Sequence, residues 1–538
     1  MGEGVRGLWY ASPLYRLVIA GKPPSGIVAV PPDPWAGSMS RGQALLRGEF
    51  SFAGRTIQIQ PDELDRALWR PGDAGAAWTA ELQSFDWLRD LAAMSGDVAR
   101  QRARQLIGLW LDRYANWHAE AWRPDLVGRR ISAWTGQYTF FCESADDAFR
   151  ARLFDSIARQ ARHLARALTR APDGIGRLAA LKGLVAASVA LPDGARLVRD
   201  LPRLIEREVT RQVLPDGGHI SRSPAMQLVG LRMLIDLRAA LRVGKHDVPE
   251  TLKGAIERMV TALRLFRHGD GGLALFNGSD EGDAAAVEAA IALAESRGRT
   301  PAALPDTGFQ RLAAGRALVI VDVGAPIAVD AVAHSGTLSF ELSIGRERLI
   351  GNCGAGAADR AEWQTAARAT AAHSTLVVDD TNSSEIHRDG HLGRRARPIE
   401  VSRSETDGNI WVDAAHDGYL LPFGLTHRRR LYLSAAGDDL RGEDQLSGAG
   451  GKAFALRFHL HPKVQASLIQ NGESILLRLP SGQGWRMRAR GGSLALADDI
   501  YLGHAGDIRR TQQIVVAGEL AGRGALVKWA LKREGKAG

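Results

Sequence analysis

Two side chains suited to binding an acid occur in the segment DGGHISRSP, residues 216–224. Its Asp-Gly-Gly start is typical of a tight turn, and Ser223 followed by Pro224 is typical of the first positions of a helix. His219 and Arg222 would then lie just before a helix N-terminus, whose free N–H groups and partial positive charge favour anions. We predict that both bind a carboxylate. The alternative is that His219 satisfies the turn backbone and Arg222 pairs with a helical acid.

A second set of chemically useful residues occurs in RRISAWTGQYTFF, residues 129–141. Arg130, Trp134 and Tyr138 recur every four residues, so on one continuous helix they would share a face. Such a row offers a cation for a carboxylate, an indole for stacking and a phenol for proton transfer. We predict Arg130 and Trp134 as substrate-binding residues and Tyr138 as an acid/base group. The alternative is that the aromatic side chains pack between helices.

A third set lies in SSEIHRDGHLGRR, residues 383–395, where glycines make a helix unfavourable and indicate a loop. His387 and Arg388 belong to this basic loop, which could close over an anionic substrate. We predict both as substrate-binding residues. The alternative is a solvated loop without a ligand.

The elements that must position these residues change character once along the chain. From about residue 78 to 294 the apolar residues follow helical spacing, as Val98, Leu106, Trp110 and Tyr114 illustrate. Short breaks between the helices predict antiparallel pairs, arranged as a bundle, a solenoid or a closed toroid. No fixed-period repeat occurs, which disfavours a consensus solenoid. Further helices are predicted over residues 147–168, 175–191, 201–214, 224–243, 249–267 and 283–297.

After residue 296 a connector rich in Pro and Gly leads into short strands separated by turns, which predicts an antiparallel sandwich or barrel. Residues 48–57 are typical of a hairpin. We therefore predict three parts. Residues 1–60 form an N-terminal extension with a short hairpin, residues 61–300 a helical domain and residues 301–538 a β domain.

Composition limits the classes of function. The 538 residues are 45% hydrophobic and 24% charged, as in an ordinary globular protein, with a net charge of +9. The basic residues are spread along the chain rather than clustered, which disfavours a nucleic-acid tail. The excess of Arg favours a polyanionic partner, and the alternative is that the charge serves only solubility. The two cysteines, Cys142 and Cys353, do not suggest a disulfide framework. No apolar run is long enough for a membrane span, and the first residues lack a convincing signal peptide.

Three long segments in the right order, residues 216–224, 334–354 and 363–380, resemble the signatures of the heparinase II/III family of polysaccharide lyases. The likeness extends over roughly residues 80–530. The resemblance implies an N-terminal (α/α) toroid followed by a C-terminal antiparallel β-sandwich, which agrees with the periodicity. It also suggests a cleft between the two domains as the place where a substrate binds.

The resemblance implies a polysaccharide lyase that cleaves an acidic, uronate-containing glycan by β-elimination. Removing the C5 proton next to a carboxylate requires a group that neutralises the carboxylate, a base, and an acid for the departing oxygen. We assign His219 and Arg222 to the carboxylate and Tyr138 to proton transfer. Glycosaminoglycans are the corresponding substrate class.

Three positions depart from the family pattern. Met226 and Gln227 stand where relatives carry Tyr and His, and Val332 stands where relatives carry a His. Neither a thioether nor an amide is a useful base near neutral pH. The alternative is therefore a catalytically degenerate glycan-binding or envelope-associated protein of the same fold.

The resemblance also suggests a zinc ion or another divalent metal. The matching positions are His334, Asn352 and His373, of which the amide is an unusual ligand. Cys353 is adjacent to Asn352, although alternation along a strand would point it to the other face. The alternative is a pair of buried, hydrogen-bonded histidines.

The partner we expect is an acidic polysaccharide or oligosaccharide, without nucleic acid and without a membrane span. Family resemblance favours a periplasmic location, and the visible N-terminus favours a cytoplasmic one. The sequence leaves open which glycan is bound, whether it is sulfated, whether cleavage is internal or terminal, and how many chains assemble.

Overall fold

The computed structural model describes residues 3–535 apart from residues 61, 70, 71, 73, 328–331, 357–360, 505, 506, 521 and 523. Two compact units divide the chain. The helical unit comprises Met1–Gln212 and Val229–Ile256, and the sheet unit comprises Val213–Leu228 and Glu257–Gly538. The N-terminal hairpin region thus belongs with the helices. The turn that carries His219 and Arg222 belongs with the sheets, which the predicted domain boundaries did not anticipate.

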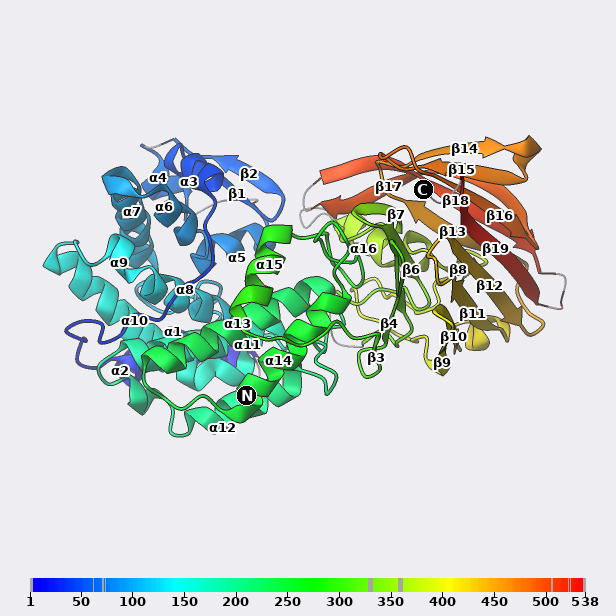
Figure 1. Ribbon diagram of the computed structural model, residues 1–538. Coiled ribbons are helices and arrows are strands. Elements are labelled where there is room, and N and C mark those ends of the chain that lie inside the picture. Colours follow the sequence, from blue (N-terminus) through cyan, green and yellow to red (C-terminus); the bar gives the residue numbers. More distant parts are fainter. Residues whose placement is uncertain are drawn as a thin grey trace. The chain divides into compact units, whose positions relative to one another are not determined.

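The helical unit is built from amphipathic helices that follow one another closely along the chain (Figure 1). The first turn of α13 and the second half of α14 belong to the sheet unit. The helices up to residue 265 are α1 (Glu3–Ala11), α2 (Pro13–Ile19), α3 (Met39–Leu46), α4 (Leu64–Ala67), α5 (Ala76–Ser84), α6 (Leu88–Met94), α7 (Gly96–Tyr114), α8 (Pro124–Gly136), α9 (Tyr138–Phe141), α10 (Asp147–Ala167), α11 (Ile175–Ala190), α12 (Leu201–Gln212), α13 (Pro224–Val243) and α14 (Glu250–Leu265). The short 3-10 helices are η1 (Leu168–Arg170) and η2 (Gly194–Leu197).

The centre of the helical unit contains α11, whose residues from Leu178 to Ala190 are almost all buried. It packs against α8 at a place where two glycines face each other. A Cβ atom added to Gly183 would lie 2.3 Å from the Cα atom of Gly128. The absence of side chains therefore permits the close approach of the two helix backbones. The predicted hairpin near the N-terminus is confirmed as β1 (Glu49–Phe52) paired with β2 (Arg55–Gln58).

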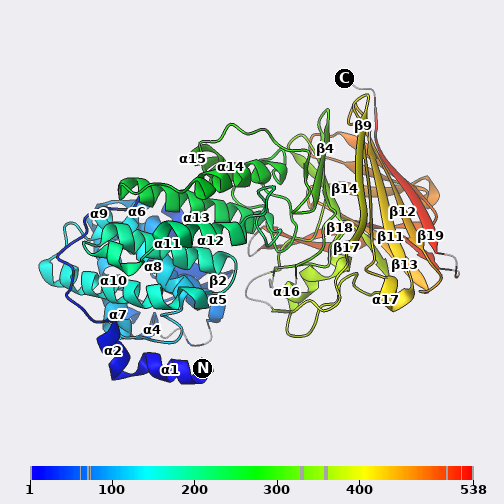
Figure 2. The ribbon, with the colours of Figure 1, turned by 90° about the horizontal axis from the view of Figure 1, so that it is seen from below.

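The sheet unit contains two sheets whose paired strands are antiparallel (Figures 1 and 2). One sheet has the order β14-β15-β16-β19-β12-β11-β10-β9, and the other has the order β17-β18-β13-β7-β6-β5-β4-β3 with β8 also paired to β13. The strands are β3 (Ala303–Leu304), β4 (Phe309–Ala314), β5 (Ala317–Asp322), β6 (Phe340–Ile344), β7 (Glu347–Gly351), β8 (Leu376–Val378), β9 (Pro398–Thr406), β10 (Asn409–His416), β11 (Thr426–Leu433), β12 (Asp439–Ser447), β13 (Ala453–Leu460), β14 (Gln465–Ile469), β15 (Ser474–Arg478), β16 (Gly484–Arg490), β17 (Ser493–His504), β18 (Asp507–Glu519) and β19 (Ala525–Arg533). Its helical segments are α15 (Ala284–Leu293), α16 (Ala361–Arg368), η3 (Thr370–Ala372), α17 (Leu420–Phe423) and η4 (Gln470–Gly472).

One apolar core joins the two sheets. Alternate residues of β11, such as Leu431 and Leu433, pack with residues of the other sheet, such as Phe340 and Phe458. Trp529 on β19 stacks on Phe340 with ring centroids 5.6 Å apart. The predicted (α/α) toroid followed by an antiparallel β-sandwich is confirmed. Among the described residues, no helix combines the length and apolar character that crossing a membrane requires.

Candidate functional site

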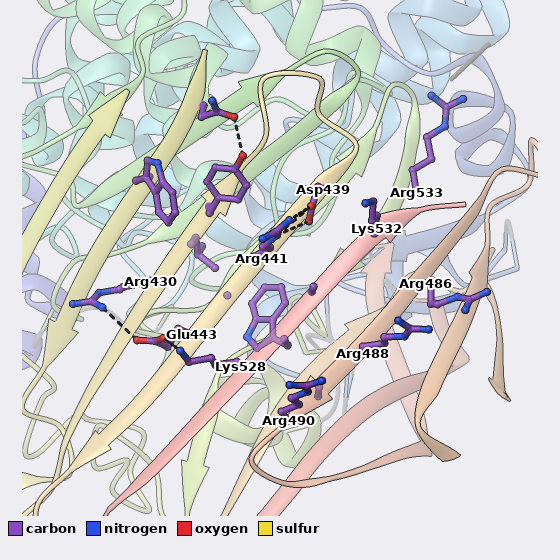
Figure 3. Close-up of a pocket in the computed structure, with 18 of the residues that line it drawn as sticks. Arg430, Asp439, Arg441, Glu443, Arg486, Arg488, Arg490, Lys528, Lys532 and Arg533 are labelled. Carbon is purple, nitrogen blue, oxygen red and sulfur yellow. Dashed lines mark hydrogen bonds and ion pairs between the residues drawn. The ribbon is translucent and has the colours of Figure 1, made fainter. Parts of the chain in front are cut away.

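A pocket of about 1190 Å³ lies on the face of the eight-stranded sheet that points away from the core (Figure 3). We call the set of side chains that lines it the basic face. Its charged members are Arg430, Asp439, Arg441, Glu443, Arg486, Arg488, Arg490, Lys528, Lys532 and Arg533, together with Asp407 and Glu534. Because successive side chains of a strand point to opposite faces, most of these residues come from every second position of their strands. Lys532 and Arg533, at the end of β19, are adjacent.

The strand register brings the basic side chains into rows across the sheet. On β19, Lys528 is opposite Glu443 of β12 on one side and Arg490 of β16 on the other. Lys532 is likewise opposite Arg486 of β16. Figure 3 shows Arg486, Arg488 and Arg490 following one another along β16. The basic face therefore combines residues as far apart in the sequence as Asp407 and Glu534.

The basic face carries more positive than negative charge. Asp439 pairs with Arg441 at 2.6 Å, and Glu443 pairs with Arg430 at 3.3 Å and with Lys528 at 3.1 Å. Glu534 pairs with Arg486 at 2.6 Å. The other four cations have no carboxylate at salt-bridge distance in the described part of the chain. They are Arg488, Arg490, Lys532 and Arg533. These four groups are free to attract an anion.

An aromatic pair adjoins the cations. The rings of Trp411 on β10 and Tyr432 on β11 lie opposite each other with centroids 4.4 Å apart, and Trp411 is 47% exposed. The Tyr432 hydroxyl donates to Oδ1 of Asn409 at 2.8 Å, which fixes its ring. The guanidinium of Arg441 lies 5.7 Å from the Tyr432 ring centroid. An apolar surface beside fixed positive charge suits a ligand with flat, weakly polar faces and acidic substituents.

Arg222, which we predicted to bind a substrate carboxylate, is engaged inside the sheet unit. It is 5% exposed and forms an ion pair with Asp322. Its Nε atom donates to the Thr307 carbonyl at 2.6 Å and its Nη1 atom to the Ala325 carbonyl at 2.9 Å. The residue has a φ of 58°, in the left-handed region. The alternative of pairing with an acid is what the structure shows, although the acid lies on β5 and not on a helix.

His219 is also buried, at 1% exposure. Its Nδ1 atom accepts from the backbone N–H of Ser221 at 3.1 Å and lies 2.7 Å from the Ser221 hydroxyl. Burial lowers the pKa of His219 to about 4, so the ring is neutral near pH 7. Its Nε2 atom has no hydrogen-bond partner among the described residues. As predicted, α13 begins at Pro224, directly after this turn.

Arg130 and Trp134 are fully buried in the helical unit rather than exposed to a ligand. The guanidinium of Arg130 donates to the side chain of Gln160 and to the carbonyls of Gln83 and Ala121, each at 2.8 Å. Burial lowers the pKa of Arg130 to about 9. The Trp134 ring contacts those of Trp110 and Phe85, each at a centroid distance of 5.2 Å. Both residues therefore stabilise the core. For Trp134 this is the alternative that the sequence left open, and for Arg130 the predicted contact with a substrate is wrong, because its donors are used by protein groups.

Tyr138 is not on the same helix as Arg130 and Trp134. Helix α8 ends at Gly136, and Tyr138 begins the short helix α9. Its ring lies 6.3 Å from that of Phe154, and burial raises the pKa of its hydroxyl above the usual value. The expected face shared by all three residues therefore does not form, because the helix stops after the second of them.

His387 and Arg388 are exposed in the loop that follows β8. The loop is narrow: the N–H of His387 donates to the His391 carbonyl at 2.9 Å, and Ile386 bridges to Leu392. A loop without a helix is what the glycines predicted. The role of both residues in substrate binding stays a prediction.

The basic face was missed in the sequence because its members are spread over six strands. A signal was present in the alternation of WRMRAR, residues 485–490, where Arg occupies every second position. The segment RRRLYL, residues 428–433, shows the same outward alternation with a tyrosine. Which strands lie side by side was not readable from that pattern.

The family is decided by two matches that together span most of the chain. Residues 70–296 match the description "Heparinase II/III N-terminus", and residues 296–530 match "Heparinase II/III-like, C-terminal". The chain belongs to the heparinase II/III family. The predicted resemblance is confirmed.

Proteins similar to this chain include one named for its position in the cell and several lyases of known structure. FtsZ-localized protein C of Caulobacter vibrioides is 33% identical over 562 residues, which cover 98% of this chain and 94% of that protein. The crystal structure of heparinase III has a TM-score of 0.73 at 13% identity, covering 97% of this chain and 89% of that one. Heparan sulfate lyase HepC from Pedobacter heparinus, as a mutant, gives 0.65 at 16% identity, covering 97% and 86%. Because the identities to the lyases are low, the similarity of structure shows a shared fold and nothing more.

The metal site that the heparinase II/III resemblance implies does not fit the residues present. Nδ1 of His334 lies 3.1 Å from Nε2 of His373, and Nδ1 of His373 donates to the Ala369 carbonyl at 2.8 Å. The Asn352 amide donates to Glu341 at 3.1 Å and accepts from the backbone N–H of Ser374 at 3.0 Å. Burial lowers the pKa of His373 to about 4. The two imidazole rings hydrogen-bond to each other, and the Asn352 amide hydrogen-bonds to Glu341 and Ser374.

The positions that differ from the heparinase II/III pattern have structural contacts of their own. The Gln227 amide nitrogen donates to the Gly217 carbonyl at 2.8 Å and to the Met259 carbonyl at 2.9 Å, and its oxygen accepts from the N–H of His219. Val332 lies against Gly278, where an added Cβ atom would be 3.0 Å from the Val332 Cβ. Gln227 thus stabilises the turn in place of supplying a base.

Proposed function

We propose that the protein binds an acidic polysaccharide on the basic face and does not cleave it. The observation that carries this proposal is the group of four cations without carboxylate partners, which share one face of the eight-stranded sheet with the aromatic pair Trp411 and Tyr432. Aromatic rings stack on the flat faces of sugars, and arginine binds carboxylate and sulfate groups through paired N–H donors. The heparinase II/III fold, which this chain shares with lyases of heparan and chondroitin, supports a glycan over other polyanions.

The chemistry of the predicted catalytic residues supports the proposal that the glycan is bound without cleavage. β-Elimination needs a base whose pKa lies near the working pH. His219 has a pKa of about 4, and the pKa of Tyr138 is raised. Arg222 is already neutralised by Asp322. These groups do not supply the three roles that the reaction requires.

Binding is tested with the full chain and a panel of heparin, chondroitin sulfate, a non-sulfated polyuronate, neutral dextran and poly-glutamate. We expect binding to at least one acidic glycan, none to dextran, and weakening as salt rises. The double variant Arg488→Glu and Arg490→Glu should lose about tenfold or more in affinity. Arg510→Glu, an exposed cation on β18 of the other sheet, is the matched control and should bind as the parent does.

Two results would overturn the glycan proposal. Equal losses in the Arg510→Glu control would show that overall charge, and not the basic face, drives binding. Binding to poly-glutamate without binding to any glycan would replace the polysaccharide by an acidic polypeptide as the partner.

A polysaccharide lyase acting on a uronate-containing glycan by β-elimination is the second candidate. The unpartnered Nε2 atom of the buried His219 favours it, because an unsatisfied donor is suited to a ligand carboxylate. Incubation with the same glycans, followed by ultraviolet absorbance of unsaturated uronides, distinguishes the two. A signal that disappears in His219→Ala would establish the lyase and refute the non-catalytic proposal.

The relative named FtsZ-localized protein C bears on where the protein acts. We propose that this chain is associated with the cell envelope at the site of division. A fluorescent fusion to the full chain in its own host should concentrate at midcell in dividing cells. Uniform fluorescence would reject this location and leave the binding proposal untouched.

A further inference from the structure

Three metal-ligating side chains meet on the nine-stranded sheet, outside the basic face and outside the histidine pair at His334. Cys353 follows the end of β7, His459 lies on β13 and Asp499 lies on β17. One ligand atom from each falls within 4.8 Å of the others. Cys353 and His459 are 4% and 2% exposed, and the side chain of Asp499 is 7% exposed.

The backbone holds this cluster in place from several directions. The N–H of Cys353 donates to the Ala372 carbonyl at 3.0 Å, and its carbonyl accepts from the N–H of Leu502 at 2.6 Å. His459 pairs with Gly351 across the β7–β13 ladder, and its N–H donates to the Ser374 hydroxyl at 3.0 Å. The three side chains are therefore preorganised by paired strands rather than by a loop of their own.

The contacts within the cluster leave the Nδ1–H group of His459 with two acceptors. Nδ1 of His459 lies 2.7 Å from Oδ2 of Asp499 and 3.4 Å from Sγ of Cys353. A single N–H group cannot point at both. The thiol of Cys353 is 3.8 Å from Oδ1 of Asp499, a long contact for a weak donor. A cation at the centre would instead attract the lone pairs of all three.

We propose that Cys353, His459 and Asp499 bind a zinc ion through Sγ, Nδ1 and a carboxylate oxygen. A thiolate, an imidazole and a carboxylate are ligands that zinc prefers, and three protein ligands leave the fourth position to water. Bond lengths of about 2.0–2.3 Å place neighbouring ligand atoms of a tetrahedron about 3.3–3.6 Å apart. The contacts of Sγ to nitrogen and oxygen, 3.4 and 3.8 Å, already lie near these values. The contact of Nδ1 with Oδ2, 2.7 Å, is too short by roughly 0.6 Å, so a carboxylate that binds through Oδ2 must move away from Nδ1 by that amount.

The charges balance without further groups. A thiolate and a carboxylate carry two negative charges, which Zn²⁺ neutralises while the imidazole stays neutral. Binding displaces both the thiol proton of Cys353 and the proton on Nδ1 of His459, so affinity should rise with pH. The ion would join segments that follow or belong to β7, β13 and β17, and so stabilise this side of the sheet.

The test uses the full chain, stripped with a chelator and titrated with Co²⁺ and Zn²⁺. We expect one equivalent of Co²⁺ with the near-ultraviolet charge-transfer band of a cobalt–thiolate bond, and displacement of Co²⁺ by Zn²⁺. Cys353→Ser should abolish the band and weaken Zn²⁺ binding at least about a hundredfold. Cys142→Ser, which removes the other buried cysteine, is the matched control and should keep both.

Two more variants keep the result decisive. Asp499→Asn should retain the thiolate band but weaken binding, which guards against a folding defect in Cys353→Ser. His373→Gln should leave binding unchanged. Failure of the chain to bind Co²⁺ or Zn²⁺, binding without a thiolate band, or loss of binding in His373→Gln with retention in Cys353→Ser would each overturn the site.

Discussion

The ion pair between Arg222 and Asp322 separates a structural role of the arginine from a catalytic one. We predict that Arg222→Ala destabilises the segments that it joins by about 4 kcal/mol, since removing one partner of a buried pair costs about 3–5 kcal/mol. Part of this loss arises because the Thr307 and Ala325 carbonyls lose their donors. Asp322→Asn keeps those two bonds and should cost about 3 kcal/mol.

Hydrogen exchange read by mass spectrometry measures this effect where it occurs. Protection should fall in residues 213–228 and 304–325 and stay unchanged in the helical unit. A single free energy for the whole chain is less informative, because two units need not unfold together. Arg509→Ala, which breaks an exposed pair with Asp507, should cost less than about 1 kcal/mol.

A double variant sharpens the measurement. Arg222→Met with Asp322→Asn removes both charges, so its cost should be less than the sum of the single variants by about 1–3 kcal/mol. Glycan binding should stay at the parental level in folded Arg222→Ala. Unchanged protection in Arg222→Ala together with a loss of glycan binding would refute the structural role and return Arg222 to the ligand site.

Two further predictions concern stability. Burial lowers the pKa of His163, His219 and His373 to about 4, so between pH 6.5 and 4 the unfolded chain binds more protons than the folded one. The contribution of these three histidines to the free energy of unfolding should therefore be constant above about pH 6.5 and fall by up to about 3 kcal/mol per histidine towards pH 4. Melting temperatures measured across this range should decline, and a flat profile would contradict it. Gly183→Ala should cost about 1–3 kcal/mol in thermal denaturation because its methyl group collides with Gly128, and a neutral effect would show that α8 and α11 can separate.

The helices and hairpins could be predicted because their signals are local. The range of α13 was predicted from residue 224 to 243, where Ser-Pro starts a helix and apolar spacing continues it, and the structure has the same bounds. The sandwich followed from many short strands separated by turns. Their order did not, because β16 pairs with β19 and β19 with β12, so neighbours in space are far apart in sequence.

The candidate site was harder to predict because residue type does not reveal burial. Arg130 lies on helix α8 and Arg488 lies on strand β16, and each belongs to a regular spacing in the sequence. Arg130 is nevertheless fully buried, whereas Arg488 lines the basic face. The sequence alone does not distinguish an arginine whose guanidinium is buried among carbonyls from an arginine that binds a substrate. Only the positions of Gln83, Gln160 and the Ala121 carbonyl around Arg130 distinguish the two.

Gln227 stands where the family resemblance leads us to expect a histidine, and its side chain stabilises the turn that precedes α13. Gln227 makes three hydrogen bonds, two as a donor to carbonyls and one as an acceptor from His219. A neutral imidazole has one donor and one acceptor, so a histidine in its place could not make all three. The amide thus stabilises the turn from Gly217 to His219 against α14, in a way that the base expected at this position could not. Gln227 therefore holds His219 in the buried turn through the backbone N–H of His219, while Arg222 is held separately by Asp322 and the Thr307 carbonyl.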